Sequence, residues 1–246
     1  MALGGRPSVS RETLERLSAR YSLSSGAVAQ LADLLEALAG EPDPPTTVSE
    51  PSAAVKVHVA DSLSGLEVDE VRSARRIADL GSGAGFPGLV LAIALPAARV
   101  DLIESARRKG ATIDRLVQAA HVTNARSVIA RAEEWAAQQP VVGGGREAYD
   151  AVTARALASL AVLAEYASPL LREGGVLVAW KGARDADEDR GGSAAAGRLG
   201  LTIERVTRVE PFEGAEHHHL HVMRKTGPTP PGIPRRAGMA RKRPLG

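Results

Sequence analysis

Hydrophobic side chains in the first 40 residues recur at helical spacing and predict two short amphipathic helices. Their apolar positions are Leu14 and Leu17 in one helix and Val28, Leu31, Leu34, Leu35 and Leu38 in the other. The second helix is expected to end near Gly40, because the proline-rich segment 41–45 cannot form helix interior. Another helix is predicted over 49–62, with Pro51 inside its first turn.

From residue 76 onward, short strand-like runs alternate with helix-length segments. The predicted strands cover 77–80, 99–103, 127–129, 149–153 and 176–180, and the predicted helices follow the first strand to Leu95 and cover 107–120 and 157–171. Repeated units of this kind indicate an α/β fold, a doubly wound and mostly parallel sheet with helices on both faces. Two more strands, 201–209 and 217–224, follow a charged, glycine-rich stretch at 185–200. No obvious helix separates these two strands, so an antiparallel pairing is open to them.

These patterns divide the chain into three parts. Residues 1–75 form an N-terminal helical extension, 76–225 an α/β domain, and 226–246 a basic C-terminal tail that is poor in order-promoting residues. A length of 246 residues fits one such domain with additions. No apolar run approaches the ~18 residues of a membrane span, and no signal-peptide pattern follows Met1. We therefore expect a cytoplasmic protein that enters no membrane and acts as a monomer.

Charge and cysteine content narrow the possible chemistry. The formal net charge is +2, but residues 223–246 carry no acidic side chain. The basic side chains of this segment are Arg224, Lys225, Arg235, Arg236, Arg241, Lys242 and Arg243. A basic tail on an otherwise acidic chain is typical of proteins with an anionic partner such as nucleic acid, although a solubilising tail has the same pattern. Cysteine is absent, which excludes disulfides and a cysteine nucleophile.

A glycine-rich segment, 79–88, follows the first strand of the α/β domain and reads DLGSGAGFPG. Residues 83–88 fit the dinucleotide pattern G-x-G-x-x-G, whereas the segment taken from Asp79 fits the methyltransferase pattern D-x-G-x-G-x-x-x-G. Asp79 favours the second interpretation, because S-adenosylmethionine carries an ammonium and a sulfonium. Pro87 also favours it, since proline removes an N–H that a phosphate site would use. No second domain large enough for a dehydrogenase substrate follows.

A carboxylate lies at or just after the end of each of the next two strands, in positions that suit an adenosine cofactor. Glu104 ends the second predicted strand at the distance from the loop where a carboxylate accepts hydrogen bonds from both ribose hydroxyls. The same carboxylate would serve NAD, so it does not separate the two interpretations. Ala132 and Glu133 follow the third strand, where an adenine would reach. We thus predict cofactor contacts at Asp79, Gly81, Gly83 and Glu104 from the loop and strand pattern.

Several segments together resemble the RsmG (GidB) family, bacterial methyltransferases that act on N7 of a guanine in 16S ribosomal RNA. They are HVADS at 58–62, the loop at 79–88, TARA at 153–156, Lys181-Gly182, HLHV at 219–222 and PRRAG at 234–238. The match covers roughly 50–245. Val57 and His218 depart from it, since the family has Arg at both positions, and its N-L-T motif is missing.

The resemblance implies a Rossmann-like class I methyltransferase that uses S-adenosylmethionine and takes 16S rRNA or the small ribosomal subunit as substrate. It places cofactor contacts at Gly81, Phe86, Ala132, Glu133 and Arg155. The candidate substrate contacts are Arg155, Lys181, Arg235 and Arg236. On this interpretation, deleting residues 226–246 is expected to weaken RNA binding and leave cofactor binding unchanged.

The proposed chemistry needs no proton transfer. Guanine N7 has an in-plane lone pair and carries no proton, so methyl transfer requires alignment and exclusion of water, not a general base. We therefore assign no catalytic residue. His58 and Asp61 lie on one helix face and are expected to fasten the N-terminal helices over the cofactor pocket. Alternatives are a class I methyltransferase acting on another RNA, a protein or a small molecule, an NAD-dependent dehydrogenase, and a non-enzymatic binding module.

One cluster invites a metal interpretation. His217, His219 and His221 alternate along a predicted strand and share one face, a geometry that zinc accepts. No cysteine or fixed carboxylate accompanies them, so we expect no metal. An RNA-facing edge and a set of polar strand positions remain as alternatives for this cluster.

Overall fold

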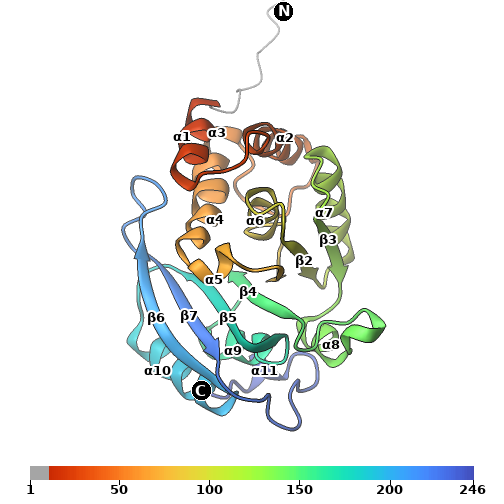
Figure 1. Cartoon of the computed structure of the whole chain (residues 1–246), viewed down its shortest axis with the longest axis vertical. Coiled ribbons are helices and arrows are strands. Elements are labelled where there is room, and N and C mark those ends of the chain that lie inside the picture. The colour runs from red at the N-terminus through yellow and green to blue at the C-terminus, as the bar shows by residue number, and fades with distance from the viewer. Residues whose placement is uncertain (1–10) are drawn as a thin grey trace, which may run out of the picture.

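A single sheet with helices on both faces dominates the computed structural model, which describes residues 11–246 (Figure 1). Its strands are β1 (Arg76–Leu80), β2 (Arg99–Glu104), β3 (Ala125–Ile129), β4 (Tyr149–Arg155), β5 (Leu171–Lys181), β6 (Leu201–Val209) and β7 (His218–Lys225). Their order across the sheet is β3-β2-β1-β4-β5-β7-β6. The first five are parallel, and β7 pairs antiparallel with β5 and β6. The predicted doubly wound sheet is confirmed, and its last two strands are indeed antiparallel.

Helices precede the sheet and connect its strands. They are α1 (Arg11–Tyr21), α2 (Ala27–Gly40), α3 (Pro51–Ala54), α4 (Asp61–Leu63), α5 (Asp69–Arg72), α6 (Gly88–Ala94), α7 (Arg107–Ala119), α8 (Ala132–Ala137), α9 (Leu160–Ala167), α10 (Ala186–Arg198) and α11 (Met239–Lys242). The helix predicted over 49–62 is a run of three pieces, in which a π-helical stretch, Val55–Ala60, separates α3 from α4. No helix within residues 11–246 is long and apolar enough to cross a membrane.

Successive side chains of each strand enter opposite cores. Ile77 belongs to the core on one face that includes side chains of α1, α2, α6 and α7, whereas its neighbour Ala78 belongs to the core on the other face with side chains of α8, α9, α10 and α11. Both faces are therefore covered, as a parallel sheet requires. The carboxyl ends of the central strands remain open, and in folds of this class ligands bind there, at the point where strand order reverses. In this sheet that point lies between β1 and β4.

The glycine-rich stretch 185–200, for which we predicted no helix, forms α10. Asp185 caps its N-terminus and accepts hydrogen bonds from the backbone N–H groups of Asp187 and Glu188. A Cβ at Gly192 would lie 2.7 Å from Cβ of Leu160 in α9. Glycine thus permits close helix packing here instead of breaking the helix, which composition alone did not reveal.

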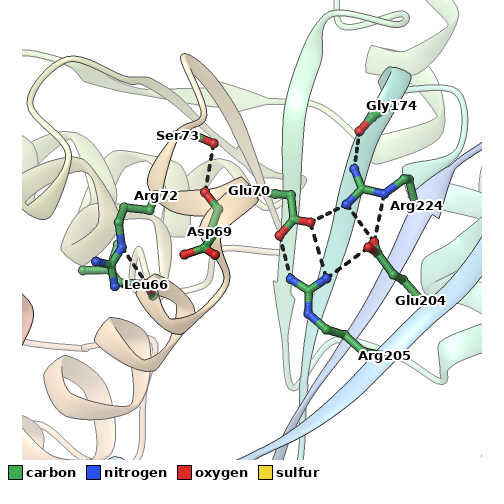
Figure 2. Close-up of polar contacts among 9 residues, drawn as sticks. All are labelled: Leu66, Asp69, Glu70, Arg72, Ser73, Gly174, Glu204, Arg205 and Arg224. Atoms are coloured by element: carbon green, nitrogen blue, oxygen red, sulfur yellow. Dashed lines mark hydrogen bonds and ion pairs between the residues drawn. The ribbon is translucent and has the colours of Figure 1, made fainter.

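An ion-pair network fastens the end of the N-terminal helical segment to the antiparallel edge of the sheet (Figure 2). Glu70 of α5 accepts from Arg205 of β6 at 2.6 Å and also pairs with Arg224 of β7. Arg224 contacts Glu204 at 2.8 Å and donates to the carbonyl oxygen of Gly174 at 2.9 Å. Glu70 thereby holds two strands to one short helix.

Candidate active site

The glycine-rich loop turns sharply at the carboxyl end of β1. Gly81 and Gly83 have φ values of +63° and +60°, a left-handed conformation that favours glycine. A Cβ at Gly81 would lie 2.5 Å from the side chain of Leu157, so a larger residue does not fit. Beside Gly83, in contrast, the nearest atom to an added Cβ is 3.8 Å away. An added Cβ at Gly83 would therefore make only ordinary van der Waals contacts, and the left-handed φ is the reason for glycine at this position.

Asp79 lies beneath this loop and supports it. Its carboxylate accepts hydrogen bonds from the N–H of Gly88 at 3.1 Å and from the hydroxyl of Thr153 at 2.8 Å. The side chain is fully buried, and this burial raises the pKa of Asp79 to about 6. The carboxylate is committed to the loop and to β4, and its contact with a cofactor stays a prediction.

Glu104 joins β2 to the loop. One carboxylate oxygen accepts from the N–H of Gly83 at 3.2 Å and the other from the N–H of Ala106 at 2.8 Å. A carboxylate has about four lone-pair positions, so two remain available for further donors. Glu104 therefore keeps the acceptor capacity that ribose hydroxyls would require.

Three neighbouring cavities lie at this edge of the sheet. The first, about 490 Å³, has among its lining residues the predicted Gly81, Glu104, Ala132 and Glu133. The second, about 460 Å³, is lined by residues of the loop and of the N-terminal segment, and includes the predicted Gly81, Gly83, Phe86 and Arg155. The third, about 240 Å³, contains Lys181 and Arg155.

Shared lining residues connect the three cavities into one groove. Gly81, Lys109 and Ala156 line both the first and the second cavity, and Ala156 also lines the third. Ala156 has a φ of +53°, which is uncommon for a residue with a Cβ and typical of strained backbone near functional sites. The groove thus brings together the loop, the end of β2 and the end of β4.

Arg155 is held on several sides where β4 ends. Its guanidinium donates to the carboxylate of Asp61 at 2.8 Å and to the carbonyl oxygen of Val57 at 2.7 Å. It also lies 3.2 Å from Nδ1 of His58. The side chains of Arg155 and Asp61 are only 15% and 8% exposed, so this ion pair is largely removed from water. The arrangement fixes the direction of the guanidinium before any ligand binds.

His58 connects the N-terminal segment to the loop. Its ring stacks on Phe86 with centroids 4.4 Å apart, and its Nε2 lies 2.8 Å from the carbonyl oxygen of Val48 and 3.1 Å from Oγ1 of Thr46. Burial and the nearby Arg155 charge lower the pKa of His58 to about 4. His58 and Asp61 thus join the N-terminal segment to the loop and to β4 beside the second cavity; that this cavity holds the cofactor stays a prediction.

Sequence reasoning did not place Asp61 and His218 among the site residues. Nδ1 of His218 lies 3.0 Å from the second carboxylate oxygen of Asp61, and both residues line the second and third cavities. His218 had appeared only as a departure from a family pattern. The alternation of side chains along a strand could have indicated this difference, because it puts His218 on the opposite face from His217, His219 and His221.

The other histidines do not gather around a common point. Nδ1 of His219 lies 3.0 Å from the carbonyl oxygen of Gly182, whereas His221 is buried with Nδ1 3.7 Å from the carboxylate of Asp189. In the part of the chain that the structure describes, residues 11–246, no group of three or more His, Cys, Asp or Glu side chains is placed to hold a metal ion.

The predicted substrate residues divide between the groove and the tail. Lys181 pairs with Glu188 at 2.6 Å, and it borders the third cavity. Arg235 forms a two-point ion pair with the buried Glu165, one contact of which measures 2.6 Å. Arg236 is exposed. Neither arginine is among the lining residues of the three cavities, so their contact with a substrate stays a prediction.

Comparison with known proteins identifies the family. A family model described as rRNA small subunit methyltransferase G (GidB) matches residues 31–215. The chain belongs to this family. Curated relatives named ribosomal RNA small subunit methyltransferase G include one from Desulfitobacterium hafniense, 37% identical over 200 residues and matched over 81% of each chain. Another, from Rubrobacter xylanophilus, is 42% identical over 199 residues, which are 80% of this chain and 75% of the relative.

Solved structures confirm the fold. An S-adenosylmethionine-dependent O-methyltransferase from Thermotoga maritima matches with a TM-score of 0.53 and 14% identity, over 80% of this chain and 72% of that one. Methanococcus jannaschii fibrillarin, a pre-rRNA processing protein, matches with a TM-score of 0.52 and 22% identity, over 68% and 74%. Such identities establish the fold alone. With family membership, the predicted class I methyltransferase fold and S-adenosylmethionine as cofactor are confirmed.

Proposed function

We propose that this chain transfers a methyl group from S-adenosylmethionine to N7 of a guanine in 16S ribosomal RNA. The observation that supports this proposal most is the groove at the carboxyl ends of the strands, in a chain that belongs to the rRNA small subunit methyltransferase G family. Glu104 and Gly81 line one part of that groove, and other residues of the glycine loop line the part beside it together with a fixed Arg155. A cofactor in the first cavity and a base in the second would lie next to each other.

The residues present fit this cofactor. It supplies a methyl group activated on a sulfonium. Glu104 retains acceptor positions for ribose hydroxyls, and Gly81 of the loop lines the same cavity as Glu104. Ala132 and Glu133 line the first cavity at the end of β3, where the adenine is expected. Asp79 acts through the loop that it supports.

The proposed reaction requires these side chains to position the cofactor and the base, and it requires no proton transfer from them. Guanine N7 carries no proton, so the groove needs no general base. Arg155 presents a planar guanidinium whose orientation is set by Asp61 and Val57. Such a group can direct a base edge or an RNA phosphate into the groove. Stacked His58 and Phe86 cover the loop and exclude water from the same place.

RNA would be held by basic side chains around the groove and on the tail. Lys181 borders the groove, and Arg236 is exposed on the tail. Arg235 is already paired with Glu165, so its contribution to RNA binding would act through the position of the tail. Because the proposed substrate is 16S rRNA in the small ribosomal subunit, we place the enzyme in the cytoplasm, and we expect it to act as a monomer.

The test is a methylation assay with labelled S-adenosylmethionine and small ribosomal subunits from a strain that lacks this enzyme. We expect label in 16S rRNA at one guanine that becomes sensitive to borohydride and aniline. Glu104→Gln should weaken cofactor binding about 30-fold, because a charge-assisted hydrogen bond contributes about 2 kcal/mol. Glu12→Gln, at an exposed carboxylate of α1, is the matched control. Label in another RNA, in protein or in a small molecule would move the proposal to that substrate.

A further inference from the structure

The C-terminal tail, residues 226–246, contributes to the first cavity. Arg241 of α11 lines this cavity together with Ala132, Glu133 and Tyr166. Its guanidinium donates to the carbonyl oxygen of Leu157 at 3.0 Å. Arg241 is not among the lining residues of the second and third cavities, where Arg155 lies. The tail therefore reaches the part of the groove in which the adenosine of the cofactor is expected.

A second contact joins the tail to the same cavity. The backbone N–H of Gly238 donates to the carboxylate of Glu133 at 2.7 Å. Gly238 has a φ of +82°, so a residue with a Cβ would be strained there. Glu133 is buried and lines the first cavity. The tail thus orients a carboxylate that belongs to the predicted adenine site.

Separate anchors hold the tail in this position. Arg235 pairs with Glu165, which is 2% exposed. Ala240 packs into the core formed with α9 and α10, and Arg198 donates to the carbonyl oxygen of Leu245 at 2.9 Å. These contacts lie before, within and after α11. The chain on both sides of Arg241 is consequently fixed, and its side chain is presented to the cavity from a defined direction.

We propose that the tail forms one wall of the cofactor pocket and that Arg241 is a positioning residue for the adenosine part of S-adenosylmethionine. A planar guanidinium stacks on aromatic rings more readily than an ammonium does, and adenine offers such a face. This inference rests on the proposed function only in taking the first cavity as the cofactor site. It reverses the expectation that deletion of residues 226–246 leaves cofactor binding unchanged.

Calorimetric binding of S-adenosylhomocysteine and of adenosine tests this assignment. Arg241→Ala should weaken both ligands by a similar factor, about tenfold, because both contain the adenosine part. Lys242→Ala is the matched control: it removes the same charge one residue away, at an exposed side chain that does not line the cavity. The control should bind both ligands as the unchanged protein does. Thermal melting of the unliganded variants verifies that both remain folded.

Two further measurements separate positioning from a general effect on structure. Arg241→Ala should raise KM for S-adenosylmethionine about tenfold with little change in kcat, because the contact lies at the adenosine and not at the methyl group. Amide hydrogen exchange of residues 238–243 should slow when S-adenosylhomocysteine is added, since a filled pocket stabilises its wall.

Each contrary result has a distinct meaning. Equal affinities of Arg241→Ala and Lys242→Ala for S-adenosylhomocysteine would overturn the role of Arg241, while the proposed methyl transfer would stand. A chain that does not bind S-adenosylhomocysteine at all would overturn both proposals together. Loss of affinity for S-adenosylhomocysteine with adenosine affinity unchanged would move Arg241 to the methionine end and contradict the assignment made here.

Discussion

Two segments outside the central strands close the groove from different sides, and they do so by different means. The N-terminal wall, residues 45–61, contributes His58 and Asp61, whose polar groups pair with Arg155 and His218 inside the protein. The C-terminal wall, residues 235–243, reaches the groove with Arg241 and with the Gly238 N–H that donates to Glu133, and Arg235 anchors it away from the groove through Glu165. One wall is a preformed network around a substrate-side arginine. The other places the cation of Arg241 beside the proposed cofactor site. Substitutions in the two walls should therefore change different measured properties.

The largest effect is expected where the N-terminal wall meets β4. Arg155→Ala leaves the carboxylate of Asp61 buried without its guanidinium partner, which should lower the free energy of unfolding by about 3 kcal/mol. Loss of the fixed guanidinium should also reduce kcat/KM for rRNA about 100-fold. Urea unfolding and methylation kinetics measure the two effects.

The double variant Arg155→Ala/Asp61→Asn separates charge burial from function. Removing the carboxylate charge, which in Arg155→Ala keeps only His218 as its side-chain partner, should recover part of the lost stability, because the remaining amide needs no ion partner. Activity should stay low, since no guanidinium has returned. Recovery of activity together with stability would show that Arg155 serves the fold and does not direct the substrate.

The C-terminal wall offers adjacent arginines with opposite environments. Arg235→Ala should cost about 2 kcal/mol of unfolding free energy, because it leaves the buried Glu165 unpaired. Arg236→Ala, at an exposed side chain, should leave stability within about 0.5 kcal/mol and reduce the salt dependence of rRNA binding by about one charge. Thermal unfolding and binding at several salt concentrations distinguish them. Equal effects of the two substitutions on stability would contradict this difference between the two arginines.

Contacts between residues close in the chain, or on neighbouring parallel strands, could be predicted from the sequence, whereas contacts between distant segments could not. The loop at 79–88 carries its own glycine spacing, and the parallel register of β1 with β2 brings Glu104 beside it. These features follow from local pattern and from the rules of parallel sheets. Asp61 and His218 are 157 positions apart, and only the path of β7 places them together.

The tail was the hardest part to predict for the same reason. Its composition indicates charge and low order, but Arg235 and Arg241 differ in partners and not in residue type. Side-chain identity could not assign one to a buried Glu165 and the other to the first cavity. The glycines of α10 led to the opposite error, a helix that was not predicted. Gly192 does not break the helix there; it permits close packing against Leu160.

Acid titration should distinguish the N-terminal wall from the loop that it covers. The pKa of His58 is lowered to about 4, so its contribution to stability is present above about 6.5 and is lost as pH falls toward 4. The pKa of Asp79 is raised to about 6, so its contribution is present below about 3.8 and is lost as pH rises through 6. Between pH 4 and 6 the two oppose each other.

Substitutions of His58 and of Asp79 should therefore change the slope of unfolding free energy against pH in opposite directions. Relative to the unchanged protein, His58→Gln should make the free energy of unfolding fall more steeply as pH rises from 4 to 6, and Asp79→Asn should make it rise. The difference in slope is at most about 1.4 kcal/mol per pH unit for each group. Arg241→Ala, in the C-terminal wall, should leave the slope unchanged. Urea unfolding across this range supplies the test, and parallel profiles for all variants would contradict it.

The smallest effect is expected at the network that ties α5 to β6 and β7 (Figure 2). Hydrogen bonding to Arg205 lowers the pKa of Glu70 to about 2, so its stabilisation is present above about 4.5 and is lost as pH falls toward 2. Glu70→Gln should cost about 1 kcal/mol at pH 7, a modest value because the side chain is 24% exposed. Unfolding midpoints at pH 7 and pH 4 should show this cost shrinking in acid. S-adenosylhomocysteine affinity should not change, because Glu70 lies outside all three cavities; a drop in affinity would mean that the N-terminal wall depends on this distant attachment.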